Sequence, residues 1–354
     1  MTTKYKYGVY IGRFQPFHLG HLHSVTTALQ HCEKLLIIVG SIKQAPSLQN
    51  PFSLAQRKSL IEQCIQEYDA TQQSNLADKI QYAGVQDYLY QENAWFADVK
   101  NIVHKFTGPS DKVAIVGHHK DSSSYYLEMF ADWERLPIEN HDGINSANIR
   151  KAVFANDLDS VTTVVPKATA TFLQTWQNSK DFVNLQNEFV FTQKYRASWQ
   201  HSPFPNLFVT VDSLVICKNH ILLIQRKQPP GKNLWAMPGG FIEEKERIQT
   251  GILRELQEET NIDVPAKELI HSQKTMQVFD YPQRSSLGRI ITHAGVFILQ
   301  REKLPKIHAA DDAKSAKWVS ITDFYSMSEK MHGDHYQIIC KLLLTYVADK
   351  QPKP

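Results

Sequence analysis

Residues 7–21 read YGVYIGRFQPFHLGH, a strand-like apolar run that passes at once into a glycine, a turn and two histidines. A continuous apolar run of this kind is typical of a strand that is buried on both faces of a sheet. The residues that follow place four apolar side chains at helical spacing: Leu22, Val25, Leu29 and Cys32. We therefore predict a strand, a tight turn and a helix in direct succession.

The same alternation continues through the first half of the chain. Residues 35–39 and 113–116 have the pattern of short buried strands, and residues 54–68 have the pattern of a helix with one apolar side. Buried strands that alternate with helices predict an α/β fold built on a doubly wound parallel sheet.

The second half has a different pattern. Residues 207–217, 221–225 and 290–299 are strand candidates, and residues 247–259 form one strong helix candidate. This mixture predicts an α+β domain with a mixed sheet.

The length of 354 residues gives two domains as a prior, at roughly 150 residues per domain. The boundary falls where periodicity weakens and where Pro203 and Pro205 interrupt the chain. We predict a first domain over residues 1–185, a linker over residues 186–206 and a second domain over residues 207–354.

The composition is that of a globular protein, with 42% hydrophobic and 21% charged residues. The longest apolar stretch, near residues 35–40, is far shorter than the roughly 20 residues that a membrane helix needs. The first residues also lack the apolar core of a signal peptide. We therefore expect a cytoplasmic protein without a membrane partner.

Charge and cysteine content narrow the function classes further. The net charge is +3, and neither half carries the dense basic patch of a dedicated nucleic-acid binder. Any anionic ligand must therefore be bound by a local site. The four cysteines are scattered without a C-x-x-C pair, which favours reduced thiols over disulfides or a zinc cluster. Whether the chain forms a homo-oligomer stays open.

The stretch GRFQPFHLGH at residues 12–21 carries the first candidate site. His18 and His21 frame a glycine where the predicted helix begins. A helix N-terminus offers unpaired N–H groups and a partial positive charge, which suit a phosphate. Arg13 and the two imidazoles add further donors, and Gly12 allows a close approach of ligand and backbone.

The stretch resembles the H-x-G-H nucleotidyltransferase superfamily, and most closely its nicotinamide-mononucleotide (NMN) adenylyltransferases. The resemblance covers roughly residues 5–170 and implies a Rossmann-like fold. Asn145 to Arg150 resembles the second signature, I-S-x-T-x-x-R, although Ala147 stands where a threonine is usual. Besides the groups already named, the resemblance implies substrate contacts from Phe14, Gln15, Arg57, Asp87, Trp95, Gly117, Lys120, Asp121, Asn145 and Ser146. For Trp95, a place in the core or at its boundary is the alternative.

The resemblance also implies the chemistry. The phosphate of NMN attacks the α-phosphorus of ATP in line and expels pyrophosphate, without a covalent intermediate. Catalysis then consists of positioning and charge stabilisation. We assign His18, His21, Arg13 and Arg150 to the triphosphate, with Mg²⁺ bridging its oxygens.

Residues 240–262 carry the second candidate site, GFIEEKERIQTGILRELQEETNI. The stretch resembles the Nudix signature G-x(5)-E-x(7)-R-E-U-x-E-E-x-G-U, where U is aliphatic, except that Asn261 replaces the last glycine. Asparagine tolerates the left-handed conformation, so a helix end is expected there.

The spacing of the box carboxylates has a physical reason. Glu255, Glu258 and Glu259 share one helical face and repel one another, which a Mg²⁺ or Mn²⁺ ion relieves. We predict a metal site from these three residues and Gly240, with Arg254 orienting a neighbouring glutamate and Glu246 in a structural role.

The family hydrolyses nucleoside diphosphates linked to another group. The stretch FDYPQRSSLGR at residues 279–289 resembles the loop of its ADP-ribose branch, although Ser285 stands where an aspartate is frequent. The resemblance implies substrate contacts from Arg284 and Arg289. HGDHY at residues 332–336 has the residue types of a metal site, but a solvated loop or helix start is the preferred interpretation.

The order of the two halves resembles bifunctional bacterial enzymes of NAD metabolism. It implies NAD synthesis from NMN and ATP, and cleavage of ADP-ribose to AMP and ribose 5-phosphate. Three alternatives remain: the same folds with another nucleotidyl acceptor or another Nudix substrate, such as NADH, a dinucleoside polyphosphate or a sugar nucleotide; a regulatory protein; or a binding protein with one inactive domain.

Overall fold

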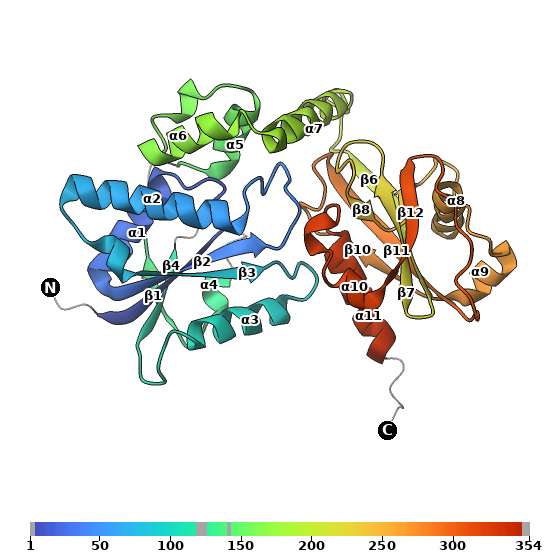
Figure 1. The fold of residues 1–354 in the computed structure, drawn as a ribbon, viewed down its shortest axis with the longest axis horizontal. Coiled ribbons are helices and arrows are strands. Elements are labelled where there is room, and N and C mark those ends of the chain that lie inside the picture. The colour runs from blue at the N-terminus through green and yellow to red at the C-terminus, as the bar shows by residue number, and fades with distance from the viewer. Residues whose placement is uncertain (1–3, 118–125, 140–142, 349–354) are drawn as a thin grey trace. The chain divides into compact units, whose positions relative to one another are not determined.

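The computed structural model describes residues 4–117, 126–139 and 143–348 (Figure 1). The chain forms two compact units, Met1–Gln186 and Asn187–Pro354. Across the described residues, no helix combines the length and the apolar character that a membrane crossing requires.

The first unit is built on a five-stranded sheet in the order β3-β2-β1-β4-β5, in which every neighbouring pair is parallel. Its strands are β1 (Tyr5–Gly12), β2 (Cys32–Ile42), β3 (Ile80–Gln86), β4 (Val113–Gly117) and β5 (Glu134–Pro137). Its helices are α1 (Leu19–His31), α2 (Leu54–Gln72), α3 (Glu92–His104), α4 (Tyr126–Met129), α5 (Ser146–Phe154), α6 (Lys167–Trp176) and the first part of α7 (Lys180–Ala197). The predicted parallel α/β fold is confirmed.

Alternation along the strands gives this sheet two buried faces. Val9 and Leu36 point to one core, which α3 covers, whereas Tyr10 and Ile37 point to the other, which α1 and α2 cover (Figure 1). Parallel strands end at the same edge of a sheet, so the residues after β1 and β4 are brought together there. In folds of this class, that edge is where ligands bind.

The segment that was expected to be a linker is largely helical, because α7 extends to Ala197. The burial of Phe182, Leu185 and Thr192 follows helical spacing, but exposed Val183 and Val190 on the opposite side obscure that period in the sequence.

The second unit is built on a mixed sheet in the order β10-β11-β6-β7-β12, with β8 paired to β7 and β9 paired to β6. Its strands are β6 (Leu207–Cys217), β7 (His220–Arg226), β8 (Trp235–Ala236), β9 (Gly239–Phe241), β10 (Gln273–Phe279), β11 (Arg289–Leu299) and β12 (Ala313–Ser320). Its helices are α8 (Ile248–Thr260), α9 (Ala266–Ser272), α10 (Ile321–Phe324) and α11 (His335–Ala348). The predicted mixed sheet with flanking helices is confirmed.

Helix α8 carries the Nudix-like box and packs on the centre of this sheet. Ile252 and Leu256 are buried against Val211 and Val215 of β6. The predicted end at Asn261 is confirmed, since this residue caps α8 at φ 38° and ψ 43°, in the left-handed region. The apolar side of α8 thus anchors the helix while its carboxylates lie toward the glycines of β9.

Candidate active sites

His18 and His21 hold each other at the start of α1. His18 is the N-cap residue, and its Nδ1 accepts the backbone N–H of His21 at 3.4 Å. The Nδ1 of His21 accepts the N–H of His18 at 3.3 Å, and the two rings stack with centroids 3.6 Å apart. This is a capping box in which imidazoles replace the usual serine and glutamate. Because both Nδ1 atoms accept, each neutral ring carries its proton on Nε2, which is then a donor.

The turn between β1 and α1 is fixed by its own side chains. Phe14 is buried, and an atom added at Gly12 as a Cβ would lie 2.8 Å from its ring. Gln15 is 1% exposed and pairs through both ends of its amide with the backbone of Phe52, each bond being 3.0 Å. We expected Phe14 and Gln15 to contact substrate. In the structure the side chains of both shape the turn, Phe14 by its packing and Gln15 by its bonds to Phe52, and the substrate contacts stay predictions.

Arg57 also differs from the expectation of a substrate contact. It is 1% exposed, and its guanidinium donates to the carbonyls of Arg13 at 2.8 Å, Gly40 at 2.6 Å and Ser41 at 3.2 Å. Burial lowers its pKa to about 10. A buried guanidinium needs such partners. Arg57 therefore joins the ends of β1 and β2, the strand ends at which the site is built.

The second signature lies directly on the first. Arg150 donates to the carbonyl of Gln15 at 2.7 Å and to that of Leu48 at 3.0 Å, and Ser146 Oγ donates to the carbonyl of Pro16 at 3.2 Å. Asn145 caps α5 by accepting the N–H of Asn148 at 3.0 Å. Residues about 130 positions apart in the chain are thus joined at one end of the sheet.

The joined signatures form a positively charged site. Burial, together with the charge of Arg13, lowers the pKa of Arg150 to about 10. The charge of Arg13 also lowers the pKa of Arg57. Arg13 itself is exposed. An exposed cation that is repelled by two buried cations is stabilised by an anionic ligand.

Asp87 belongs to a chain of polar side chains whose donors and acceptors have a fixed direction. Its carboxylate accepts Ser41 Oγ at 3.1 Å and Gln44 Nε2 at 2.6 Å. Gln44 must therefore present its oxygen to Asn50 Nδ2, which donates to it at 3.3 Å. Within the described part of the chain, Asn50 Oδ1 is buried and has no hydrogen-bond partner. This series of hydrogen-bonded side chains therefore ends at Asn50 Oδ1, an acceptor that needs a donor.

The remaining predicted residues of the first unit are placed as follows. Trp95 is half-buried on α3 and packs on Phe96 and Phe130, with ring centroids 5.2 and 6.1 Å apart, which fits the core-boundary alternative. Gly117 ends β4 against Leu127. Lys120 and Asp121 lie outside the described residues, as do the two histidines before them.

Arg254 organises the Nudix-like box of the second unit. It donates to Glu246 at 2.9 and 3.0 Å, to Glu255 at 2.8 Å and to Glu258 at 2.9 Å. These bonds raise the pKa of Arg254 and, at Glu246, lower the pKa of the carboxyl. The structural role predicted for Glu246 and the orienting role predicted for Arg254 are confirmed.

Glu255 and Glu259 pack against the two glycines of β9. Glu259 is 4% exposed and accepts the N–H of Gly239 at 2.8 Å, and burial raises its pKa to about 8. A Cβ on Gly240 would lie 2.5 Å from Glu255 Oε1. Burial also raises the pKa of Glu255. The box needs glycine here because carboxylates occupy the space of any larger residue.

The carboxylates of the box do not converge on one point. Among the described residues, no group of three or more histidine, cysteine, aspartate or glutamate side chains is placed to hold a metal ion. Glu258 is half-exposed and turned to Arg254, whereas Glu259 is turned to Gly239. The chemistry of the donors nevertheless fits a hard divalent cation. Besides burial, the charge of Glu258 raises the pKa of Glu255 and the charge of Glu255 raises that of Glu259, and a cation relieves this repulsion.

A buried polar cluster beside the box escaped the sequence analysis. Asp212 of β6 accepts Thr292 Oγ1 and lies 3.9 Å from His335 Nδ1. Burial lowers the pKa of both His332 and His335. Of the two interpretations preferred for HGDHY, the helix start is confirmed, since α11 begins at His335, whereas a solvated loop is wrong, since Asp334 is 3% and His335 9% exposed. The only signal in the sequence was that motif itself.

The two arginines of the 279–289 loop are placed differently from each other. Arg284 forms a bidentate ion pair with Asp334, at 2.9 and 3.0 Å, and its side chain is 7% exposed. The predicted substrate contact of Arg284 stays a prediction, and in the structure its Nε and Nη2 are engaged by Asp334. Arg289 is 37% exposed and bonds to the carbonyl of Asp280.

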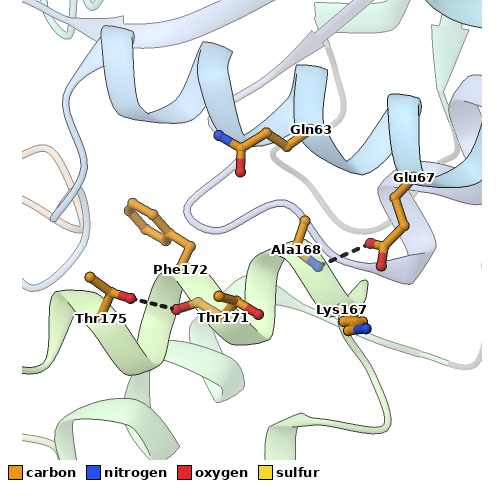
Figure 2. Close-up of a pocket in the computed structure, with 7 residues that line it drawn as sticks. All are labelled: Gln63, Glu67, Lys167, Ala168, Thr171, Phe172 and Thr175. Carbon is orange, nitrogen blue, oxygen red and sulfur yellow. Dashed lines mark hydrogen bonds between the residues drawn. The ribbon is translucent and has the colours of Figure 1, made fainter.

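A groove lies apart from these constellations, between α2 and α6 of the first unit (Figure 2). It has a volume of about 360 Å³ and is lined by Gln63, Glu67, Lys167, Ala168, Thr171, Phe172 and Thr175. The N–H of Ala168 donates to Glu67 at 3.0 Å across it. None of the predicted site residues lines the groove, and it takes no part in the chemistry below.

Two family models match the chain. The cytidylyltransferase-like model matches residues 9–152, and the NUDIX domain model matches residues 207–342. Among characterised relatives, the nicotinamide/nicotinic acid mononucleotide adenylyltransferase of Acinetobacter baylyi is 32% identical over 195 residues, which are 55% of this chain and 95% of that protein. The ADP-ribose pyrophosphatase of Methanocaldococcus jannaschii is 35% identical over 131 residues, 37% of this chain and 70% of that protein.

Solved structures resemble both units together. A bifunctional NMN adenylyltransferase/ADP ribose pyrophosphatase from Francisella tularensis is 40% identical, with a TM-score of 0.89 over 96% of this chain and 99% of that chain. The same enzyme in complex with AMP and a manganese ion is 39% identical, with a TM-score of 0.88 and the same coverage. With both signatures, both folds and this full-length similarity in place, the chain belongs to the family of bifunctional NMN adenylyltransferase/ADP-ribose pyrophosphatases.

Proposed function

We propose that the first unit transfers AMP from ATP to NMN, and that the second unit hydrolyses ADP-ribose to AMP and ribose 5-phosphate. The observation that carries the proposal is that each unit assembles its own site suited to a ligand with linked phosphate groups. The first holds two signatures together through Arg150 and Gln15, and the second holds its box through Arg254. The direct test is ³¹P NMR of the products that the full chain forms from each substrate set.

In the first unit, positioned donors perform the catalysis. The Nε2 groups of His18 and His21 and the guanidinium of Arg13 lie where α1 begins, beside Arg150. We assign these four to the triphosphate of ATP. The NMN phosphate attacks the α-phosphorus, the bond to the β,γ-pyrophosphate breaks, and that group leaves with the electron pair. The donors stabilise the charge that develops on the phosphate oxygens.

In the second unit, we assign Glu255, Glu258, Glu259 and the backbone of Gly240 to a divalent cation, Mg²⁺ or Mn²⁺. When bound, such an ion polarises a pyrophosphate and lowers the pKa of water. Arg254 keeps the box carboxylates in position, and its bonds to Glu246 fix its own direction. Arg289, at the exposed start of β11, is the cation that we assign to the substrate.

We also propose that the first unit prefers NMN over its nicotinic acid counterpart. Asp87 sets the direction of the chain through Gln44 to Asn50 and leaves Asn50 Oδ1 as a bare acceptor. A carboxamide can donate to this oxygen, whereas a carboxylate cannot and is also repelled by Asp87.

Asp87→Asn is therefore expected to lower the ratio of kcat/KM for NMN to kcat/KM for nicotinic acid mononucleotide by about tenfold, because the repulsive charge is lost. Steady-state kinetics with both substrates measures this ratio. Glu92→Gln, in the first turn of α3, is the matched control that removes an exposed carboxylate. An unchanged ratio in Asp87→Asn would remove Asp87 from substrate selection.

The proposed partners are small nucleotides, with no nucleic acid or membrane among them. We further place the chain in the reducing cytoplasm. This placement is supported by its four cysteines, all of them free thiols and three of them buried.

A further inference from the structure

The residues at the start of α11 form a buried junction between two segments of the second unit. We call His332 to His335 the H-G-D-H segment. The backbone N–H of His332 donates to the carbonyl of Trp235 at 2.8 Å. The Nδ1 of His335 accepts the N–H of Met237 at 3.2 Å. The segment thus holds the strand that leads into Gly239 and Gly240 of the box.

The same segment holds the 280–288 loop through Asp334. Both oxygens of Asp334 accept from Arg284, at 2.9 and 3.0 Å, and the two side chains are 4% and 7% exposed. Gly333 has φ +51°, and a Cβ there would lie 3.7 Å from the Arg284 carbonyl. The chain therefore turns tightly beside the loop, and a glycine permits that turn.

The far end of this loop reaches the box. A Cβ on Gly288 would lie 3.3 Å from the ring of Phe208, and that ring contacts Phe241, the residue after Gly240, with centroids 6.0 Å apart. Arg289 follows Gly288 directly. The loop therefore ends at the exposed cation that we assign to the substrate.

We infer that Asp334 is a positioning residue of the hydrolase site, acting through Arg284 on the 280–288 loop. The inference rests on the proposed hydrolysis of ADP-ribose. It gives Arg284 a purpose that differs from the direct substrate contact implied by its loop. Turning this guanidinium to a ligand would break both of its bonds to a buried carboxylate.

Three variants separate the positioning role from direct contact: Asp334→Asn, Arg284→Met, and Arg284→Met combined with Asp334→Leu. Asp334→Asn keeps the shape of the side chain and removes its charge. Arg284→Met combined with Asp334→Leu replaces the pair by apolar side chains of similar volume, which buried ion pairs often tolerate. If Arg284 positions the loop, the double variant recovers function that Arg284→Met alone has lost. If Arg284 binds substrate, the double variant stays as impaired as the single one.

The experiment uses the full chain and two readouts. Steady-state kinetics gives KM and kcat for ADP-ribose, and hydrogen–deuterium exchange of the substrate-free protein reports on peptides covering residues 280–288. NAD synthesis by the same samples normalises the amount of active first unit, and the split between kcat and KM distinguishes loss of the folded second unit. Arg301→Met is the matched control, since it breaks a bidentate but partly exposed pair with Glu268 in the same unit.

We expect Asp334→Asn to raise KM for ADP-ribose by about tenfold, to leave kcat within about threefold, and to accelerate exchange in the loop. A loss of folded protein alone would lower kcat and leave KM unchanged. Unchanged exchange in the loop, or a double variant with the KM of Arg284→Met, overturns the inference. If the parent chain does not hydrolyse ADP-ribose, the proposed function fails, and exchange in the loop still decides the role of Asp334.

Discussion

Replacing His21 by alanine is expected to slow NAD synthesis by about 100- to 1,000-fold, because one preorganised donor to the polyphosphate is lost. The same loss is expected for His18→Ala. Coupled spectrophotometric assay of NAD at saturating NMN and ATP measures the rate. His31→Ala, at the exposed far end of α1, is the control that removes an imidazole without touching the site.

These histidines also cap α1, so loss of activity must be separated from loss of the helix end. His21→Gln serves this purpose, because a glutamine at this position can still accept the N–H of His18 in the manner of an ordinary capping box. We expect His21→Gln to retain the thermal stability of the parent while remaining slow. A rate near that of the parent in His21→Gln would show that the imidazole takes no part in transfer.

Glu259→Gln is expected to reduce ADP-ribose hydrolysis by about 100-fold or more, because a carboxylate assigned to the divalent cation is neutralised. The amide oxygen can still accept the N–H of Gly239, so the β9 backbone should stay in place. Single-turnover kinetics with Mg²⁺ titrated over a wide range measures both the rate and the cation requirement. Glu258→Gln is expected to behave in the same way.

The control for the box is Glu244→Gln, an exposed carboxylate at a variable position of the same motif. Its rate and its Mg²⁺ requirement should match those of the parent. If Glu259→Gln and Glu258→Gln both kept the parent's rate at every Mg²⁺ concentration, the assignment of the box to a catalytic cation would be wrong.

Much of the fold could be predicted from the sequence, because several elements carry continuous or strictly periodic apolar patterns. β1 and β2 each contain a continuous apolar run, and α8 has an apolar side that packs on β6. β3 and β5 were not predicted, since both lie at or near the sheet edge with mostly half-buried or exposed residues. A strand with little buried surface leaves little hydrophobic pattern.

The motifs could be located along the chain from the sequence, but the direction of their side chains could not. Gln15, Arg57 and Arg284 stand in the expected motifs, but each is buried and paired with backbone or with a carboxylate. A polar residue type shows that a partner is needed, whereas the identity of that partner depends on the tertiary structure. The partner of Arg284 lies 50 residues further along the chain, which no local pattern reveals.

The burial of the H-G-D-H segment also depends on tertiary partners that its local sequence does not show. Its glycine, aspartate and histidines have the composition of a solvated turn. The segment becomes buried only because Arg284 neutralises Asp334 and because Met237 donates to His335. Local composition therefore predicted exposure where tertiary pairing produced a buried junction.

Two separate activities in one chain can be followed by ³¹P NMR of the full-length protein with Mg²⁺. With NMN and ATP, the account predicts the growth of NAD diphosphate and pyrophosphate signals. With ADP-ribose added afterwards, it predicts the loss of the ADP-ribose diphosphate signals and the appearance of two phosphomonoesters, AMP and ribose 5-phosphate. Persistence of NMN and ATP, or of the ADP-ribose diphosphate, over a prolonged incubation would contradict the account for the corresponding unit.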